Sequence, residues 1–143
     1  AEASFYQEQW RQVLGIEVAV NSMITKQGSQ NRKTGNYVMS VTGWGPDYND
    51  PNTFLDMWVT DGGNNQTGFS NERYDELIDL AAKETDLEKR ESYFMECEQL
   101  IADQLPIGPS FWRAPSYACS DKIKGGMHRS TFQDINAVYV KLS

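Results

Sequence analysis

The segment "GWGPDYNDP", residues 43 to 51, holds the side chains of this chain that are best suited to chemistry. Trp44 and Tyr48 offer aromatic rings, and Asp47 and Asp50 offer two carboxylates three positions apart. Such a pair suggests general acid–base catalysis or the first ligands of a calcium loop. The calcium pattern fails, because a proline stands at the fifth position of that loop and no glycine stands at the sixth.

The same segment is also suited to binding an extended peptide. Gly43 and Gly45 have no side chains, so another backbone can approach closely and pair with them by strand addition. Trp44 would form an apolar wall, and Asp47 would accept a cationic amine in a charge-assisted hydrogen bond worth roughly 1.5–3 kcal/mol. The local sequence leaves an alternative open, in which Trp44 is a core residue and Asp47 is only a turn residue before a helix.

Motifs for other kinds of catalysis or for cofactor binding are missing from the sequence. His128 stands in the glycine-led stretch "GGMHRS" without partners for a triad or a metal cluster, and we interpret it as a surface residue. Cys97 and Cys119 fit no metal spacing and leave one disulfide pairing open, although Cys97 lies on an apolar stripe typical of buried residues. No serine occupies a G-x-S-x-G elbow, and Gly43–Gly45 lacks the third glycine of a dinucleotide fingerprint. The sequence therefore predicts no cofactor and no metal.

Composition predicts a single globular domain over residues 1–143. Hydrophobic residues make up 39% and aromatic residues 12% of the 143 positions, which is enough for one core and far from a disordered composition. The net charge of −7 disfavours nucleic acid as a partner, because it repels phosphate backbones. No apolar run approaches the roughly 20 residues that span a bilayer. The chain begins at Ala1 rather than at methionine, which we interpret as the mark of a processed or excised product.

Hydrophobic periodicity predicts an α/β fold with a sheet packed by helices. Alternating apolar residues indicate two strands in the first third of the chain, and a weak polar helix separates them. This order suggests a βαβ-like unit, because neighbouring parallel strands need a long crossover. The expected strands cover residues 16–23, 37–43 and 134–143, and the polar helix lies within residues 25–36.

Four further helices are expected. One covers residues 4–15, and a short one over 51–59 follows Asp50 as its cap. Ser70 and Thr85 are expected to cap two longer helices that pack together on the sheet. The residues expected to face inward are Phe54, Leu55 and Trp58 in the short helix, Tyr74, Leu77, Ile78 and Ala81 in the next, and Leu87, Phe94, Cys97, Leu100 and Ile101 in the last.

The segment "GWGPDYNDPNTFLDMW" closely resembles the signature of the extracytoplasmic oligopeptide-binding proteins of ABC importers. These are the family 5 solute-binding proteins, a group that also includes dipeptide and nickel binders. Further segments match in the same order: the strand "YVMSVTGW", the helix pair from "FSNERYDELIDLAAKE" to "ECEQLIADQLPIGPSFW", and the closing "NAVYVKLS". The resemblance extends over residues 16 to 143.

The resemblance implies that this chain is the C-terminal lobe fragment of a larger, two-lobed, non-catalytic protein. Its fold would be part of one lobe of a type II periplasmic-binding-protein-like fold, with a mixed sheet. The aspartate matching Asp47 receives the α-amino group of the peptide in this family, and the tryptophan matching Trp44 lines a side-chain pocket. Backbone around Gly43 and Gly45 pairs with the peptide main chain, and Tyr48 is a further candidate for the site.

Partners and location also follow from the resemblance. It implies an oligopeptide ligand, an ABC importer permease as membrane partner, and a place outside the cytoplasmic membrane, in a periplasm or on a lipid anchor. We also expect self-association through the strand over 134–143 or through the exposed cleft surface, because an unpaired edge strand invites pairing.

Several alternatives remain open. Within the family, the ligand could instead be a dipeptide, nickel, haem or a sugar. Outside it, the rivals are a hydrolase that uses Asp47 and Asp50, and a protein-interaction module built on the helices over 71–104. The hydrolase needs one carboxyl with a raised pKa, and Asp50 is expected to cap a helix instead.

Overall fold

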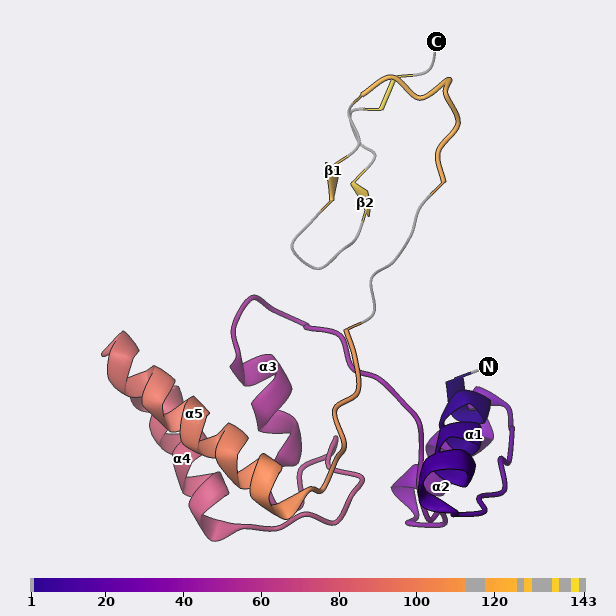
Figure 1. The fold of residues 1–143 in the computed structure, drawn as a ribbon. Helices are drawn as coiled ribbons and strands as arrows, with labels where there is room; N and C mark the ends of the chain where they lie inside the picture. Colours follow the sequence, from indigo (N-terminus) through magenta and orange to yellow (C-terminus); the bar gives the residue numbers. More distant parts are fainter. Residues whose placement is uncertain (1, 113–117, 126–127, 130–134, 137–139, 142–143) are drawn as a thin grey trace. The chain divides into compact units, whose positions relative to one another are not determined.

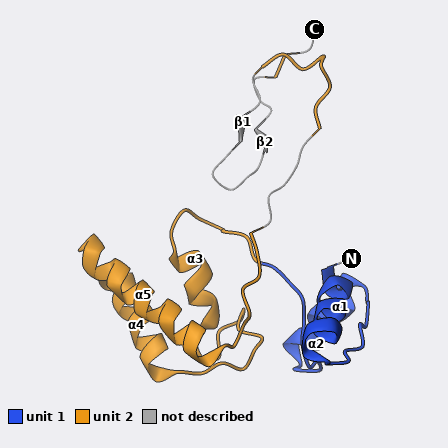
Figure 2. Cartoon of the chain, in the orientation of Figure 1, with its two compact units in different colours: residues 1–43 blue, residues 44–143 orange. Residues whose placement is uncertain are grey.

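A computed structural model describes residues 2–112, 118–125, 128–129, 135–136 and 140–141 of the chain (Figure 1). The chain divides into two units, unit 1 over residues 1–43 and unit 2 over residues 44–143, which Figure 2 colours separately. The expectation of one domain over the whole chain stays a prediction.

Unit 1 contains the helices α1 (Glu2–Leu14) and α2 (Thr25–Lys33), both of which the sequence predicted. α1 is followed by Gly15, whose φ of +67° lies in the left-handed region that favours glycine. The Ile16 N–H then donates to the carbonyl of Trp10 at 3.2 Å. The side chain of Gln7 donates to the carbonyl of Val18 at 2.5 Å, which holds the segment after the helix beside α1.

Neither of the two strands expected in unit 1 is present among the described residues. Residues 16–23 and 37–43 have no regular secondary structure, and no backbone hydrogen-bond ladder joins them to another described segment. Their apolar side chains are largely exposed, Val38 completely. Alternating apolar residues favour a strand only where a partner supplies the ladder and covers one face, so the mixed sheet stays a prediction.

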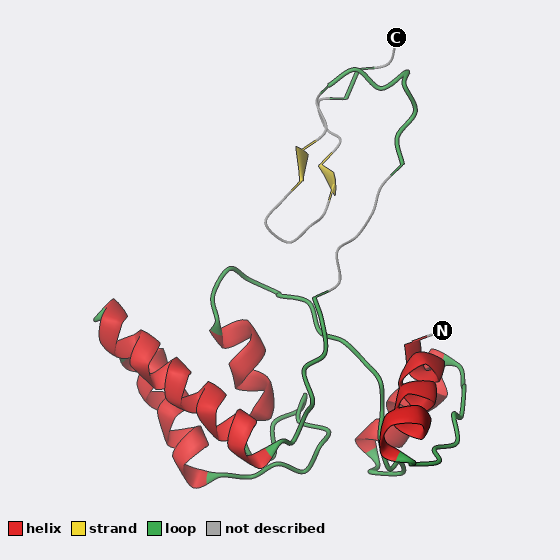
Figure 3. Cartoon of the chain, viewed as in Figure 1, coloured by secondary structure: helices red, strands yellow, loops and turns green. Residues whose placement is uncertain are grey.

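Unit 2 is built mainly from helices (Figure 3). They are α3 (Asn52–Leu55), the 3₁₀ helix η1 (Asp56–Trp58), α4 (Glu72–Lys83) and α5 (Leu87–Gln104). α4 packs against α5, and α3 also contacts α5. No sheet lies under the helix pair among the described residues, so the packing of the two helices on a sheet stays a prediction.

The core of unit 2 lies between these helices. Tyr74 and Leu77 are fully buried, and the Tyr74 hydroxyl donates to the carbonyl of Leu55 at 2.7 Å, which joins α4 to α3. All four inward residues expected in α4 are buried, whereas Leu87 in α5 is exposed. The core residues are Leu55, Phe69, Tyr74, Leu77, Ile78, Ala81, Phe94, Cys97 and Ile101.

The N-terminal caps of α4 and α5 each lie one residue later than predicted. Asn71, not Ser70, accepts a hydrogen bond from the N–H of the third helical residue, at 3.0 Å. Asp86, not Thr85, does the same in α5 at 2.9 Å. Asn and Asp rank among the strongest N-caps, and Ser70 instead bonds the hydroxyl of Thr60 at 3.1 Å.

The prediction that Cys97 is buried is confirmed, and Cys97 is a free thiol. Burial raises the pKa of the Cys97 thiol to about 11. Cys97 therefore acts as a small apolar core residue.

Beyond the helices, the described residues include one two-stranded antiparallel sheet. Strand β1 (His128–Arg129) pairs with β2 (Ile135–Asn136), with His128 opposite Asn136. β2 covers two positions of the strand expected over 134–143, and most of that strand lies outside the described residues. The structure describes the backbone of His128 but not its side chain, whose predicted exposure stays a prediction.

Candidate ligand-binding loop

Trp44 is held by its indole nitrogen while much of its ring faces solvent. Nε1 donates a hydrogen bond to the carbonyl of Thr53 in α3 at 3.0 Å. The residue is nevertheless 42% exposed. The alternative in which Trp44 belongs to the core is therefore wrong, and the ring is a fixed apolar surface beside the start of α3.

Asp47 is held through its backbone and leaves its carboxylate exposed. Its N–H donates to the hydroxyl of Thr53 at 2.9 Å, so Thr53 bonds both Trp44 and Asp47. Within the described part of the chain, the Asp47 carboxylate makes no hydrogen bond or ion pair. The backbone of Asp47 thus makes the turn before α3, as the alternative reading expected, while the carboxylate remains accessible to a cation.

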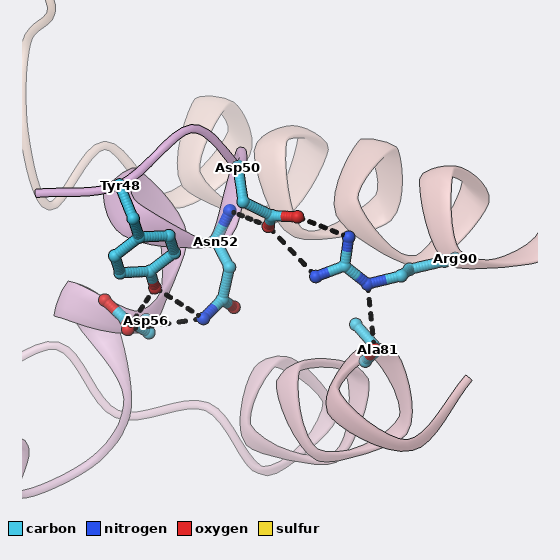
Figure 4. A network of polar contacts seen from close by, with 6 residues as sticks. All are labelled: Tyr48, Asp50, Asn52, Asp56, Ala81 and Arg90. Carbon is cyan, nitrogen blue, oxygen red and sulfur yellow. Dashed lines mark hydrogen bonds and ion pairs between the residues drawn. The ribbon is translucent and has the colours of Figure 1, made fainter. Parts of the chain in front are cut away.

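The Tyr48 hydroxyl takes part in a network of polar side chains at α3 (Figure 4). It donates to the Asp56 carboxylate at 3.1 Å and accepts from the Asn52 amide at 3.0 Å. Asn52 also donates to Asp56 at 3.3 Å. Partial burial raises the pKa of Tyr48, so the phenol stays protonated at neutral pH. Only the ring of Tyr48, which is partly exposed, is free to contact a ligand.

Asp50 has two structural roles. Its carboxylate accepts the N–H of Asn52 at 2.9 Å and so bonds the first turn of the short helix, but the N-cap position predicted for Asp50 is held by Pro51. Its two oxygens also accept from both terminal nitrogens of Arg90 in α5, at 2.6 and 2.9 Å (Figure 4). The hydrogen bonds from Arg90 lower the pKa of Asp50. Asp50 is therefore a structural carboxylate that is ionised at neutral pH.

Gly43 and Gly45 leave open space beside the backbone. A Cβ placed on either residue would meet no atom within 4 Å, leaving aside the adjacent residues. Among the described residues, no hydrogen bond uses the backbone groups from Gly43 to Gly45. The addition of a peptide strand at these groups stays a prediction.

Four residues that shape the loop were not identified from the sequence: Asn52, Thr53, Asp56 and Arg90. Thr53 is 2% exposed, and Phe54, expected inside, is only partly buried. A threonine beside a proposed ligand loop gives no local signal, because its two partners lie 9 and 6 positions earlier. Arg90 lies 40 positions after Asp50, so only the folded chain brings them together.

Two further features of the described residues bear on the site. No three His, Cys, Asp or Glu side chains among them are grouped so as to hold a metal ion. None of the helices that the structure describes has the length and apolar character needed to cross a membrane.

Comparison with known proteins identifies the family. Residues 1–66 match the family model of bacterial extracellular solute-binding proteins, family 5 Middle. The oligopeptide-binding protein OppA of Bacillus subtilis is 31% identical over 86% of this chain and 23% of that protein. The periplasmic murein peptide-binding protein MppA of Escherichia coli is 29% identical over 71% of this chain and 19% of that protein. The chain thus spans about a quarter of the length of such relatives or less.

Solved structures agree with this match. The substrate-binding domain of an oligopeptide ABC transporter from Bacillus anthracis superposes with a TM-score of 0.85 and 28% identity, over 98% of this chain and 28% of that chain. Listeria monocytogenes OppA bound to peptide gives a TM-score of 0.81 and 30% identity, over 99% and 27% of the two chains. The chain belongs to the family 5 extracellular solute-binding proteins.

Proposed function

We propose that this chain supplies part of the ligand site of a substrate-binding protein that captures oligopeptides outside the cytoplasmic membrane for an ABC importer. The relatives named above are oligopeptide- and murein-peptide-binding proteins, which supports binding rather than catalysis. Because the chain spans only about a quarter of their length, this proposal concerns the whole protein. The remaining ligand contacts would come from sequence outside this chain.

The observation that carries the proposal is the pairing of an exposed carboxylate with a fixed, half-exposed indole on one short loop. We assign the α-amino group of the peptide to Asp47 and a peptide side chain to the ring of Trp44. Gly43 and Gly45 pair with the peptide main chain, whose approach the open space beside them allows. The ring of Tyr48 borders the same surface.

The partners and the location belong to the same proposal. The membrane partner is the permease of the importer, and the protein lies in a periplasm or on a lipid anchor outside the cytoplasmic membrane. One relative is named as periplasmic, which supports this location. Self-association through the strand over 134–143, or through the binding surface, remains part of the proposal. A monomer in light scattering at high concentration would count against it.

No observation favours a second function. Dipeptide, nickel, haem and sugar ligands remain family alternatives without a specific feature of this loop in their support. A hydrolase that uses Asp47 and Asp50 needs a proton donor with a raised pKa, but Arg90 lowers the pKa of Asp50.

The test uses the full-length protein that includes this chain. Its ligands are peptides that are released from the purified protein and identified by mass spectrometry. Calorimetry should show that Trp44→Ala and Asp47→Ala each weaken peptide binding about tenfold or more, as expected for one lost charge-assisted bond or aromatic wall. Asp79→Ala is the matched control, because it removes the same charge from an exposed position of α4. Unchanged affinity in both loop variants would show that this loop is not the site.

A further inference from the structure

We propose that Thr53 is the positioning residue of the ligand site, and that its hydroxyl sets the place of the Asp47 carboxylate relative to the Trp44 ring. This inference rests on the proposed function and deepens it. Thr53 itself is 2% exposed, so it acts through its two partners and not by touching the ligand.

The two partners of Thr53 use different atoms of it. The backbone carbonyl accepts the indole N–H of Trp44 at 3.0 Å, and the side-chain hydroxyl accepts the backbone N–H of Asp47 at 2.9 Å. One residue therefore fixes both ends of a four-residue segment. The carbonyl bond survives any substitution of the side chain, whereas the hydroxyl bond does not, so the two anchors can be separated by mutation.

Thr53 is well placed to act as a rigid anchor. Its own N–H donates to the carbonyl of Asp50 at 3.2 Å, and Asp50 is bound in turn by Arg90 of α5. A β-branched side chain has few χ1 states in a helix, so its hydroxyl is held in place with little loss of entropy. Because the Asp47 carboxylate has no partner of its own among the described residues, the backbone bond to Thr53 is the contact that restricts its position.

The chemistry of the substitutions separates positioning from simple packing. Thr53→Val keeps the shape of the side chain but removes the acceptor for the Asp47 N–H. Thr53→Ser keeps the acceptor but removes a buried methyl group. A residue that only fills space would tolerate valine better than serine, whereas a positioning residue would tolerate serine better than valine.

The experiment compares two peptides that differ only at the N-terminus, one with a free amine and one acetylated. Binding to the full-length protein is measured by calorimetry for the wild type, Thr53→Val and Thr53→Ser. We expect the preference for the free amine to fall about tenfold in Thr53→Val and to stay within about twofold of wild type in Thr53→Ser. A second pair of peptides differs only in carrying an aromatic residue or alanine at the side chain assigned to Trp44. The preference for the aromatic peptide should persist in both Thr53 variants, because the Thr53 carbonyl still holds Trp44.

Hydrogen exchange of the Asp47 amide provides a readout that needs no ligand. It should be about tenfold faster in Thr53→Val than in Thr53→Ser, because only valine leaves that N–H without its partner. Equal exchange rates, or an unchanged amine preference in Thr53→Val, would overturn the role of Thr53 but would leave the proposed function standing. Loss of the preference in Thr53→Ser would overturn it even if the valine variant did not fold. Failure of the wild type to bind either peptide would instead overturn the proposed function, and this inference with it.

Discussion

Arg90 and Asp50 form a bidentate ion pair that joins the candidate ligand-binding loop, residues 43 to 51, to helix α5. The guanidinium donates to both carboxylate oxygens at 2.6 and 2.9 Å, and its Nε donates to the carbonyl of Ala81 at the end of α4 at 3.0 Å. The guanidinium carbon also lies 4.7 Å from the centre of the Phe94 ring. A single side chain thus connects the loop with both long helices of unit 2.

Replacing Arg90 by lysine should destabilise the protein by about 1–2 kcal/mol, because an ammonium cannot reproduce the fork to Asp50 and the bond to Ala81 together. Urea unfolding of the full-length protein would measure the change. Arg73→Lys is the matched control, because Arg73 forms a similar fork to Glu96 with both side chains 46% exposed, against 24% and 28% for Arg90 and Asp50. The control should leave the unfolding midpoint nearly unchanged. Equal effects of the two substitutions would contradict the special role of Arg90.

The same ion pair predicts acid sensitivity. The folded pKa of Asp50 is lowered, chiefly by hydrogen bonds from Arg90, so its stabilisation is complete above the ordinary aspartate pKa of about 4 and is lost as pH falls through the folded value. Asp50→Asn should therefore be less stable than wild type at pH 7, and the difference should shrink at low pH. Unfolding free energies of both proteins between neutral and acid pH would measure this, since all other groups cancel in the difference. A difference that stays constant with pH would rule out the linkage.

Removal of the Tyr48 hydroxyl should lower the stability of the protein more than its affinity for peptide. Tyr48→Phe breaks the bonds to Asp56 and Asn52, which should lower stability by about 0.5–1 kcal/mol. Peptide affinity should stay within about twofold, because the hydroxyl is already engaged and the ring is retained. Calorimetry of Tyr48→Phe and Tyr48→Ala would separate the contribution of the hydroxyl to peptide affinity from that of the ring, since only alanine also removes the ring. A large loss of affinity in the phenylalanine variant would show that the hydroxyl contacts peptide.

The loop after η1 depends on the amide of Asn65. Its Nδ2 donates to the carbonyls of Trp58, Val59 and Phe69 at 3.3, 3.0 and 2.8 Å. Asn65→Asp would place a carboxylate against three carbonyl oxygens and should cost about 2–3 kcal/mol. Thermal unfolding should show a clear drop for this variant and almost none for Asn64→Asp, which makes the same change at an exposed neighbour. Similar curves for the two variants would show that the amide bonds are dispensable.

Local sequence was sufficient for the helices and for much of their burial. The apolar spacing of Tyr74, Leu77, Ile78 and Ala81 follows the helical period, and all four are buried in α4. The N-caps of α4 and α5 lie one residue later than predicted, at Asn71 and Asp86. Each follows a serine or threonine that could also act as a cap, so the sequence offers two candidates at each helix start. The path by which the chain enters the helix decides between them. The exposure of Leu87 was missed, because the first residue of a helix follows the helical period whether or not the neighbouring helix covers it.

The sequence by itself determined which residue types stand on the candidate ligand-binding loop. It also determined which segments become helices, because helix formation depends on neighbours within a few positions. Only the tertiary structure decided that Thr53 holds Trp44 and Asp47, and that Arg90 binds Asp50 from 40 positions away. Those bonds exist only where folding brings distant groups within hydrogen-bond reach. Strand pairing has the same requirement: residues 16–23 and 37–43 carry a strand-like pattern, but a strand forms only beside a partner.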